Sequence, residues 1–159
     1  MKDLYSGSEI VELGIQIEKN GRDFYTVLAR QTKNKAAAEI FVYLAGEEEK
    51  HIEAFKSILE QTEKFEVPSS YADEYFAYMN ALAGGYVFTQ KDKGSQIAKG
   101  ITRDKEAVLM GIGFEKDSIL FYEGMKKTVP QGHLSVIDGL IRQEQGHLKQ
   151  LSDLNRKIS

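Results

Sequence analysis

The sequence of 159 residues contains no cysteine. Without thiol side chains the protein forms no disulfide, no iron–sulfur cluster, no cysteine-ligated zinc site and no rubredoxin-type iron centre. A cysteine-free chain is stable in oxidising and in reducing compartments, so this absence does not locate the protein. Any metal site must be built without thiolates.

Proline is almost absent as well, and both prolines, Pro68 and Pro130, lie between helical patterns. Because proline interrupts a helix from within, the stretches between them are free to form long helices. Apolar residues in these stretches recur at helical spacing, as Ile10, Leu13 and Ile17 do near the start. The sequence therefore predicts an all-α protein.

The sequence has neither a basic stripe nor a long apolar run. The net charge is −3 and the pI is about 5.7, so we expect no nucleic-acid partner. No apolar run is long enough to cross a bilayer, and no apolar leader precedes the first helical pattern, so we expect no membrane association and a cytoplasmic location. The length and a hydrophobic content of 42% fit one domain over residues 1–159.

Histidine is scarce, with three residues in the chain, and two of them follow a glutamate by three positions. These pairs are Glu48 with His51 and Glu144 with His147. Positions i and i+3 of a helix project from one face, so each pair can offer a carboxylate and an imidazole to one metal ion. One such pair would be weak evidence, because glutamate is common in this sequence.

The pairs gain weight from an internal repeat that surrounds them. The segment from Glu18 to Phe24-Tyr25 recurs as Glu115 to Phe121-Tyr122, at nearly the same distance before each pair. Internal repeats indicate that one structural unit occurs twice. The repeat predicts two copies of a helix pair.

Helix boundaries follow from capping residues and prolines. We expect helices from 8 to about 31, from a cap at Asn34 to about 64, from Thr102 or Asp104 to before Pro130, and over 134–157. The short joins make antiparallel pairs at 8–64 and 102–157, connected by a long crossover at 65–101. An aromatic-rich stretch, 71–88, can form a short helix within the crossover. The prediction is a four-helix bundle of two repeated antiparallel pairs.

Six side chains of this bundle form a candidate dinuclear metal site. One glutamate from each of two helices, with Glu-x-x-His from each of the other two, is the pattern of dinuclear carboxylate sites in bundles. Two divalent cations would balance four clustered carboxylates, which otherwise repel one another. Taken singly, such residues are commonly solvated, but apolar neighbours place these on the buried side. The candidate metal ligands are Glu18, Glu48, His51, Glu115, Glu144 and His147.

Two helical stripes surround the glutamates of the first and third helices. Small residues lie one turn to either side of each carboxylate and would leave room for metals. A tyrosine follows two turns later, either as a donor to the glutamate of its own helix or simply as a core aromatic residue. The stripes are Gly14, Glu18, Gly21 and Tyr25, and Gly111, Glu115, Ser118 and Tyr122.

This doubled pattern of Glu…Phe-Tyr followed by Glu-x-x-His resembles the rubrerythrin family of ferritin-like di-iron proteins, over about residues 8–155 apart from the crossover. The resemblance implies a ferritin-like bundle in which Glu48 and Glu144 bridge two irons. The other four ligands would be terminal. It also implies reduction of hydrogen peroxide, while ferritin-like relatives oxidise iron or act as oxygenases.

Two features depart from the family pattern. Typical rubrerythrins carry a rubredoxin domain, whereas this chain has no cysteine, so its electrons would come from a separate, rubredoxin-like donor protein. Rubrerythrins also carry a further carboxylate one turn after the third-helix ligand, where this chain has Ser118. The remaining set of six is more similar to a bacterioferritin or oxidase site.

Three functional hypotheses follow. The leading one is a non-haem di-iron oxidoreductase that reduces peroxide or dioxygen, and the second is a ferroxidase or iron-handling protein. The third is a non-enzymatic bundle that metal merely stabilises. Carboxylate and imidazole ligands suit iron, and they also accept manganese or zinc. We further expect a homodimer or a higher homo-oligomer.

Overall fold

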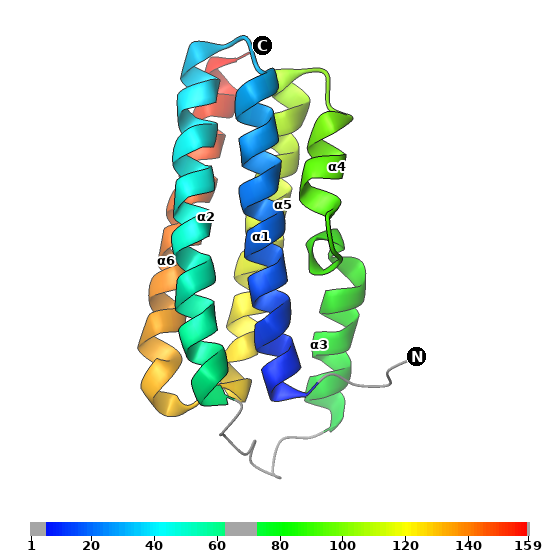
Figure 1. Ribbon diagram of the computed structural model, residues 1–159, viewed down its shortest axis with the longest axis vertical. Coiled ribbons are helices and arrows are strands. Elements are labelled where there is room, and N and C mark those ends of the chain that lie inside the picture. The colour runs from blue at the N-terminus through cyan, green and yellow to red at the C-terminus, as the bar shows by residue number, and fades with distance from the viewer. Residues whose placement is uncertain (1–5, 63–72, 159) are drawn as a thin grey trace.

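The computed structural model describes residues 6–62 and 73–158, which form the predicted all-α bundle (Figure 1). Within these ranges no residue belongs to a β-strand. The four long helices are α1 (Gly7–Gln31), α2 (Lys35–Thr62), α5 (Asp104–Met125) and α6 (Leu134–Lys157). None of the helices in the described ranges combines the length and apolar composition that a membrane span requires.

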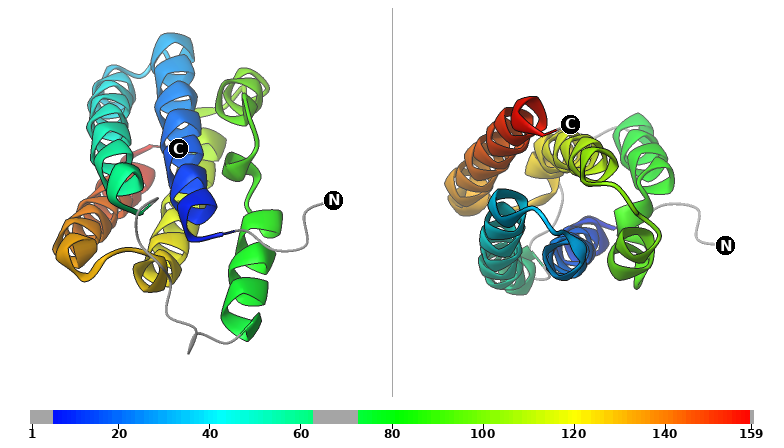
Figure 2. Two further views of the ribbon diagram at one scale, coloured as in Figure 1. Left: turned by 60° about the horizontal axis from the view of Figure 1, so that its bottom comes forward. Right: turned by 90° about the horizontal axis from the view of Figure 1, so that it is seen from above.

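The long helices form two antiparallel hairpins that pack side by side, α1 with α2 and α5 with α6 (Figures 1 and 2). Ser6 caps α1, since its hydroxyl accepts from the backbone N–H of Glu9 at 3.3 Å and donates to the Glu9 carboxylate at 2.8 Å. The predicted cap of α2 is confirmed, because Asn34 Oδ1 accepts from the Ala37 N–H at 3.0 Å. Two 3₁₀ turns, η2 (Lys126–Thr128) and η3 (Gln131–His133), join α5 to α6.

The crossover is more ordered than the sequence indicates. It contains α3 (Asp73–Gly85), the 3₁₀ turn η1 (Val87–Thr89) and α4 (Lys93–Lys99), where we expected a single short helix. These elements run along the outside of the bundle against α1 and α5 (Figure 2). Residues 65–72 of the predicted crossover, including the start of its aromatic stretch, lie outside the described residues.

One buried asparagine ties the crossover to α1. Asn20 donates from Nδ2 to the carbonyls of Phe88 and Gln90, both at 2.6 Å, and accepts from the Gly94 N–H at 2.9 Å. Gly94 approaches so closely that a Cβ there would lie 1.9 Å from the Asn20 carbonyl oxygen. A side chain at this position is therefore incompatible with the packing of α4 on α1.

The crossover also completes the aromatic core. The rings of Phe88 and Phe114 lie 4.0 Å apart between centroids, and Phe24 meets both edge-on. Tyr86 stacks on the same cluster. Because these rings come from α1, α5 and the segment around η1, the crossover is part of the core that surrounds the middle of the bundle.

We predict that Asn20→Ala destabilises the protein by about 3 kcal/mol, because three hydrogen bonds are lost at about 1 kcal/mol each and two of them, to Phe88 and Gly94, are buried. Chemical denaturation measures the change. Asn80→Ala is the matched control, since among the described residues the Asn80 amide donates to the Phe76 carbonyl of its own helix alone. An Asn20 variant as stable as the control would contradict the role assigned to this residue.

Candidate di-metal centre

The structure brings all six candidate ligands together in the middle of the bundle. Each of the four long helices contributes, with one glutamate each from α1 and α5 and a Glu-x-x-His pair each from α2 and α6. All six side chains are buried, and none is more than 4% exposed. The residues are Glu18, Glu48, His51, Glu115, Glu144 and His147.

The six side chains form two overlapping groups, in each of which the potential ligand atoms lie within 4.8 Å of one another. Each group has three carboxylates and one imidazole. Glu48 and Glu144 belong to both groups. This is the arrangement that two neighbouring cations with two shared carboxylates require. The groups are Glu18, Glu48, His51 and Glu144, and Glu48, Glu115, Glu144 and His147.

Several polar atoms at the centre have no hydrogen-bond partner in the described part of the chain. Both imidazoles turn Nδ1 towards carboxylates, His51 to Glu144 Oε1 at 2.7 Å and His147 to Glu48 Oε1 at 3.3 Å, but neither contact has the geometry of a hydrogen bond. Burying polar atoms without partners is costly. The unpartnered atoms are Glu18 Oε2, Glu48 Oε1, His51 Nδ1, Glu144 Oε1 and His147 Nδ1. All are oxygen or nitrogen donors aimed into one space, so the residues fit divalent iron, manganese or zinc.

The electrostatics of the cluster also favour the binding of cations. Burial, followed by repulsion from Glu144, raises the pKa of both Glu48 and Glu115 well above the usual range. Burial also disfavours the charged form of His51, but Glu18 and Glu144 outweigh it and raise its pKa to about 11. Burial would likewise raise the pKa of Glu144, yet its close contacts with Glu115 and both histidines hold it below the usual value. In the absence of cations, protons must provide the positive charge of this site.

Two tyrosines hold the terminal carboxylates across the bundle. Tyr25 on α1 donates to Glu115 Oε1 on α5 at 2.7 Å, and Tyr122 on α5 donates to Glu18 Oε1 on α1 at 2.6 Å. The sequence left two alternatives open, a bond from each tyrosine to the glutamate of its own helix or a role as a core aromatic residue only. Two turns of helix separate those positions by about 11 Å, so the glutamate of the facing helix is nearer. The repeat thus forms a reciprocal pair of hydrogen bonds.

The small residues of the two stripes serve different purposes. Gly21 faces the site, because a Cβ there would lie 2.9 Å from Glu48 Oε2. Gly14 instead makes room for Met125, and Gly111 for Leu151 and Tyr25. The prediction that small residues leave space for metals is therefore wrong for Gly14 and Gly111, whose space is taken by core side chains.

The structure adds residues that sequence reasoning missed. Gln143 Oε1 lies 2.5 Å from His51 Nε2 and accepts a hydrogen bond from it, so that in the neutral imidazole Nε2 carries the proton and Nδ1 is free to face a cation. Tyr86, from the crossover, hydrogen-bonds to Ser118 at 2.9 Å beside Glu115. Tyr86 has no counterpart in the repeat, so no sequence signal identified it.

Comparisons with known proteins agree with this arrangement. The family model described as Rubrerythrin matches residues 9–155. A crystal structure from Thermotoga maritima, provisionally described as a ferritin-like diiron-carboxylate protein, aligns with a TM-score of 0.69 at 22% identity over 98% of both chains. This likeness confirms the ferritin-like fold. No curated protein matches the chain.

We predict that the metal-free protein takes up about two ferrous ions per chain, and that each shared carboxylate matters for both. Glu18→Ala should leave about one tightly bound ion, because Glu18 belongs to one group, whereas Glu48→Ala should weaken both. Anaerobic titration followed by elemental analysis measures the stoichiometry. Glu49→Ala is the control, since its carboxylate is exposed and, within the described ranges, forms an ion pair with Arg22 alone. Equal metal content in all three variants would contradict the assignment.

Proposed function

Because the chain belongs to the rubrerythrin family, we propose that it is a non-haem di-iron oxidoreductase that reduces hydrogen peroxide or dioxygen. The observation that carries the proposal is the pair of overlapping ligand groups with Glu48 and Glu144 in common. Two shared carboxylates would keep two irons adjacent, as a two-electron reaction on one small oxidant needs.

In this proposal each helix pair would hold one iron with three of its own residues and with one carboxylate of the other pair. Glu18 and His51 would be terminal ligands on one side, and Glu115 and His147 on the other. When bound, the two irons supply two electrons and a pair of Lewis-acid positions. The buried surroundings keep bulk water away from the reacting centre.

The tyrosines keep the terminal carboxylates in place. Burial, and then the charge of Glu115, raises the pKa of Tyr25 well above its usual value, so the phenol stays protonated and continues to donate. Burial and the charge of Glu18 do the same for Tyr122. Each carboxylate therefore has one oxygen fixed by a phenol, and in Glu18 the other oxygen lies 3.4 Å from His51 Nδ1.

Electrons for the reaction would come from a separate protein. Reduction of one hydrogen peroxide to two waters consumes two electrons and two protons. The chain has no cysteine and hence no rubredoxin-type iron centre of its own. We propose a small iron protein of the rubredoxin type as the donor.

A homo-oligomer is a second partner proposal. Val42 and Tyr43 are neighbouring apolar residues on α2 with exposures of 63% and 49%, and a contact between copies of the chain would cover them. Light scattering on the purified protein measures the mass. The cytoplasmic location stays a prediction from the sequence.

We predict that the reduced, iron-loaded protein is reoxidised by stoichiometric hydrogen peroxide faster than by dioxygen, as seen by stopped-flow absorbance. Glu115→Gln should slow this reaction by at least about tenfold, because it weakens a ligand of one iron. Glu106→Gln, on the exposed face of the same helix, should not change the rate. If the reduced protein does not react with hydrogen peroxide, the proposed peroxidase activity is wrong.

One observation favours ferroxidase activity as the second candidate. Ser118 stands where rubrerythrins have a further carboxylate, and its hydroxyl pairs with Tyr86. The site therefore has six candidate ligands among the described residues. If the protein is a ferroxidase, dioxygen should react faster than peroxide, and added ferrous iron should turn over beyond the bound pair. If metal raises the stability of the protein but no redox reaction occurs, the remaining hypothesis is the non-enzymatic bundle.

A further inference from the structure

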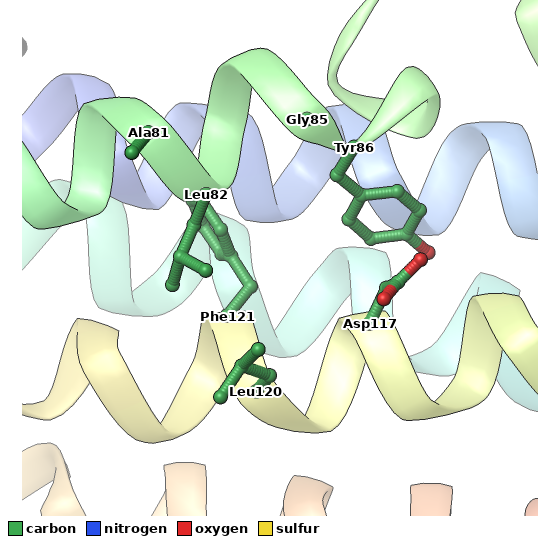
Figure 3. A pocket seen from close by; sticks show the side chains of 7 residues that line it. All are labelled: Ala81, Leu82, Gly85, Tyr86, Asp117, Leu120 and Phe121. Atoms are coloured by element: carbon green, nitrogen blue, oxygen red, sulfur yellow. The ribbon is translucent and has the colours of Figure 1, made fainter.

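Tyr86 lies between two cavities that otherwise have no lining residue in common. The outer cavity, about 150 Å³ in volume, opens to solvent between α3 and α5. Figure 3 shows the Tyr86 ring reaching from the end of α3 towards α5 at one end of this cavity. The remaining lining residues are Ala81, Leu82, Gly85, Asp117, Leu120 and Phe121.

The inner cavity lies on the other side of Tyr86, against the candidate metal centre. Glu48 and Glu115 line it, together with Gly21 and Ser118. Its volume of about 10 Å³ is close to the least that one water molecule needs. A Cβ on residue 21 would lie 2.9 Å from Glu48 Oε2, so the glycine keeps this space open.

The Tyr86 side chain is held in place at its hydroxyl and at the face of its ring. Its hydroxyl donates to the Phe114 carbonyl at 2.9 Å, and since a phenol has one hydrogen, the Ser118 hydroxyl donates to it in turn at 2.9 Å. The ring also stacks on Phe88 with centroids 5.7 Å apart. The side chain is 4% exposed, so it separates the two cavities in this structure.

We infer that small oxidants reach the metal centre between α3 and α5, and that Tyr86, fastened to Ser118 and the Phe114 carbonyl, restricts access to molecules the size of hydrogen peroxide. The inference rests on the proposed function, because it concerns the oxidant of that same site. The inner cavity has a volume of only about 10 Å³, so a molecule must widen it to enter, and an organic hydroperoxide must widen it far more than hydrogen peroxide. Tyr86 is thus a specificity-determining residue.

The opposite face of the bundle offers the competing route. A cavity of about 160 Å³ between α2 and α6 is lined by Tyr43, Glu47 and His147, among others. In the described part of the chain, none of the four candidate carboxylate ligands lines it. The cavity ends on an imidazole, so a molecule there would not face the space that the carboxylates enclose.

The first test uses azide as the probe on protein loaded with cobalt(II), which needs no redox reaction. Without its hydrogen bonds, the ring at position 86 should leave its closed position about ten times as often. Tyr86→Phe should therefore speed azide association by about that factor. Tyr86→Ala should speed it further. Tyr78→Ala is the matched control, since Tyr78 is an exposed tyrosine on α3, the helix that ends just before Tyr86.

The second test narrows the outer cavity and opens the opposite one. Ala81→Trp adds bulk at an exposed lining position and should slow azide association, while Tyr43→Ala should leave it unchanged. Acceleration by Tyr43→Ala but not by the Tyr86 variants would assign access to the α2–α6 face and overturn the inference.

The third test measures selectivity with the reduced, iron-loaded protein. The wild type should react with hydrogen peroxide far faster than with cumene hydroperoxide, and Tyr86→Ala should shrink that ratio by at least about tenfold. Equal azide rates and equal ratios in all variants would overturn the inference and leave the proposed function standing. Failure to bind cobalt or iron would instead overturn the proposed function, and the inference with it.

Discussion

The burial of four carboxyl groups at one point of a helical bundle is the constraint on which the structure depends. Such a cluster is unfavourable unless positive charge enters it, and His51, whose pKa is raised, supplies part of that charge. The elements around the cluster can be understood as a means of holding it. Four long helices supply the ligands, two phenols fix the terminal carboxylates, and the crossover covers one side.

The covering of the site is uneven, and this asymmetry bears on function. The face between α1 and α5 carries the crossover, anchored by Asn20 and extended into the core by Phe88. The face between α2 and α6 has no such cover among the described residues, and His147 lies under Tyr43 there. In the proposed function, this asymmetry would let a small oxidant and electrons reach the centre from different directions.

The bundle and its family could be predicted from the sequence because helical periodicity, caps and repeated motifs depend on residues that are close together in the sequence. The convergence of the six candidate ligands was predictable for the same reason, since each Glu-x-x-His pair is local. The crosswise bonds of Tyr25 and Tyr122 were not, because they depend on which helix faces which. The sequence could not identify Tyr86 as a site residue, because Tyr86 lies in the crossover, outside the repeat. The position of Tyr86 is set by the bonds of Asn20 to the crossover and by packing on Phe114.

The reciprocal tyrosines have a consequence for the origin of the chain. Each helix pair brings three residues to one ligand group, but depends on its twin for a fourth ligand and for the phenol that fixes its terminal glutamate. A single helix pair could therefore complete the site only by associating with a second copy. Once two copies are joined in one chain, their sequences no longer need to be identical. Gly21 and Ser118, which occupy equivalent positions, could then diverge into an open space and a hydroxyl.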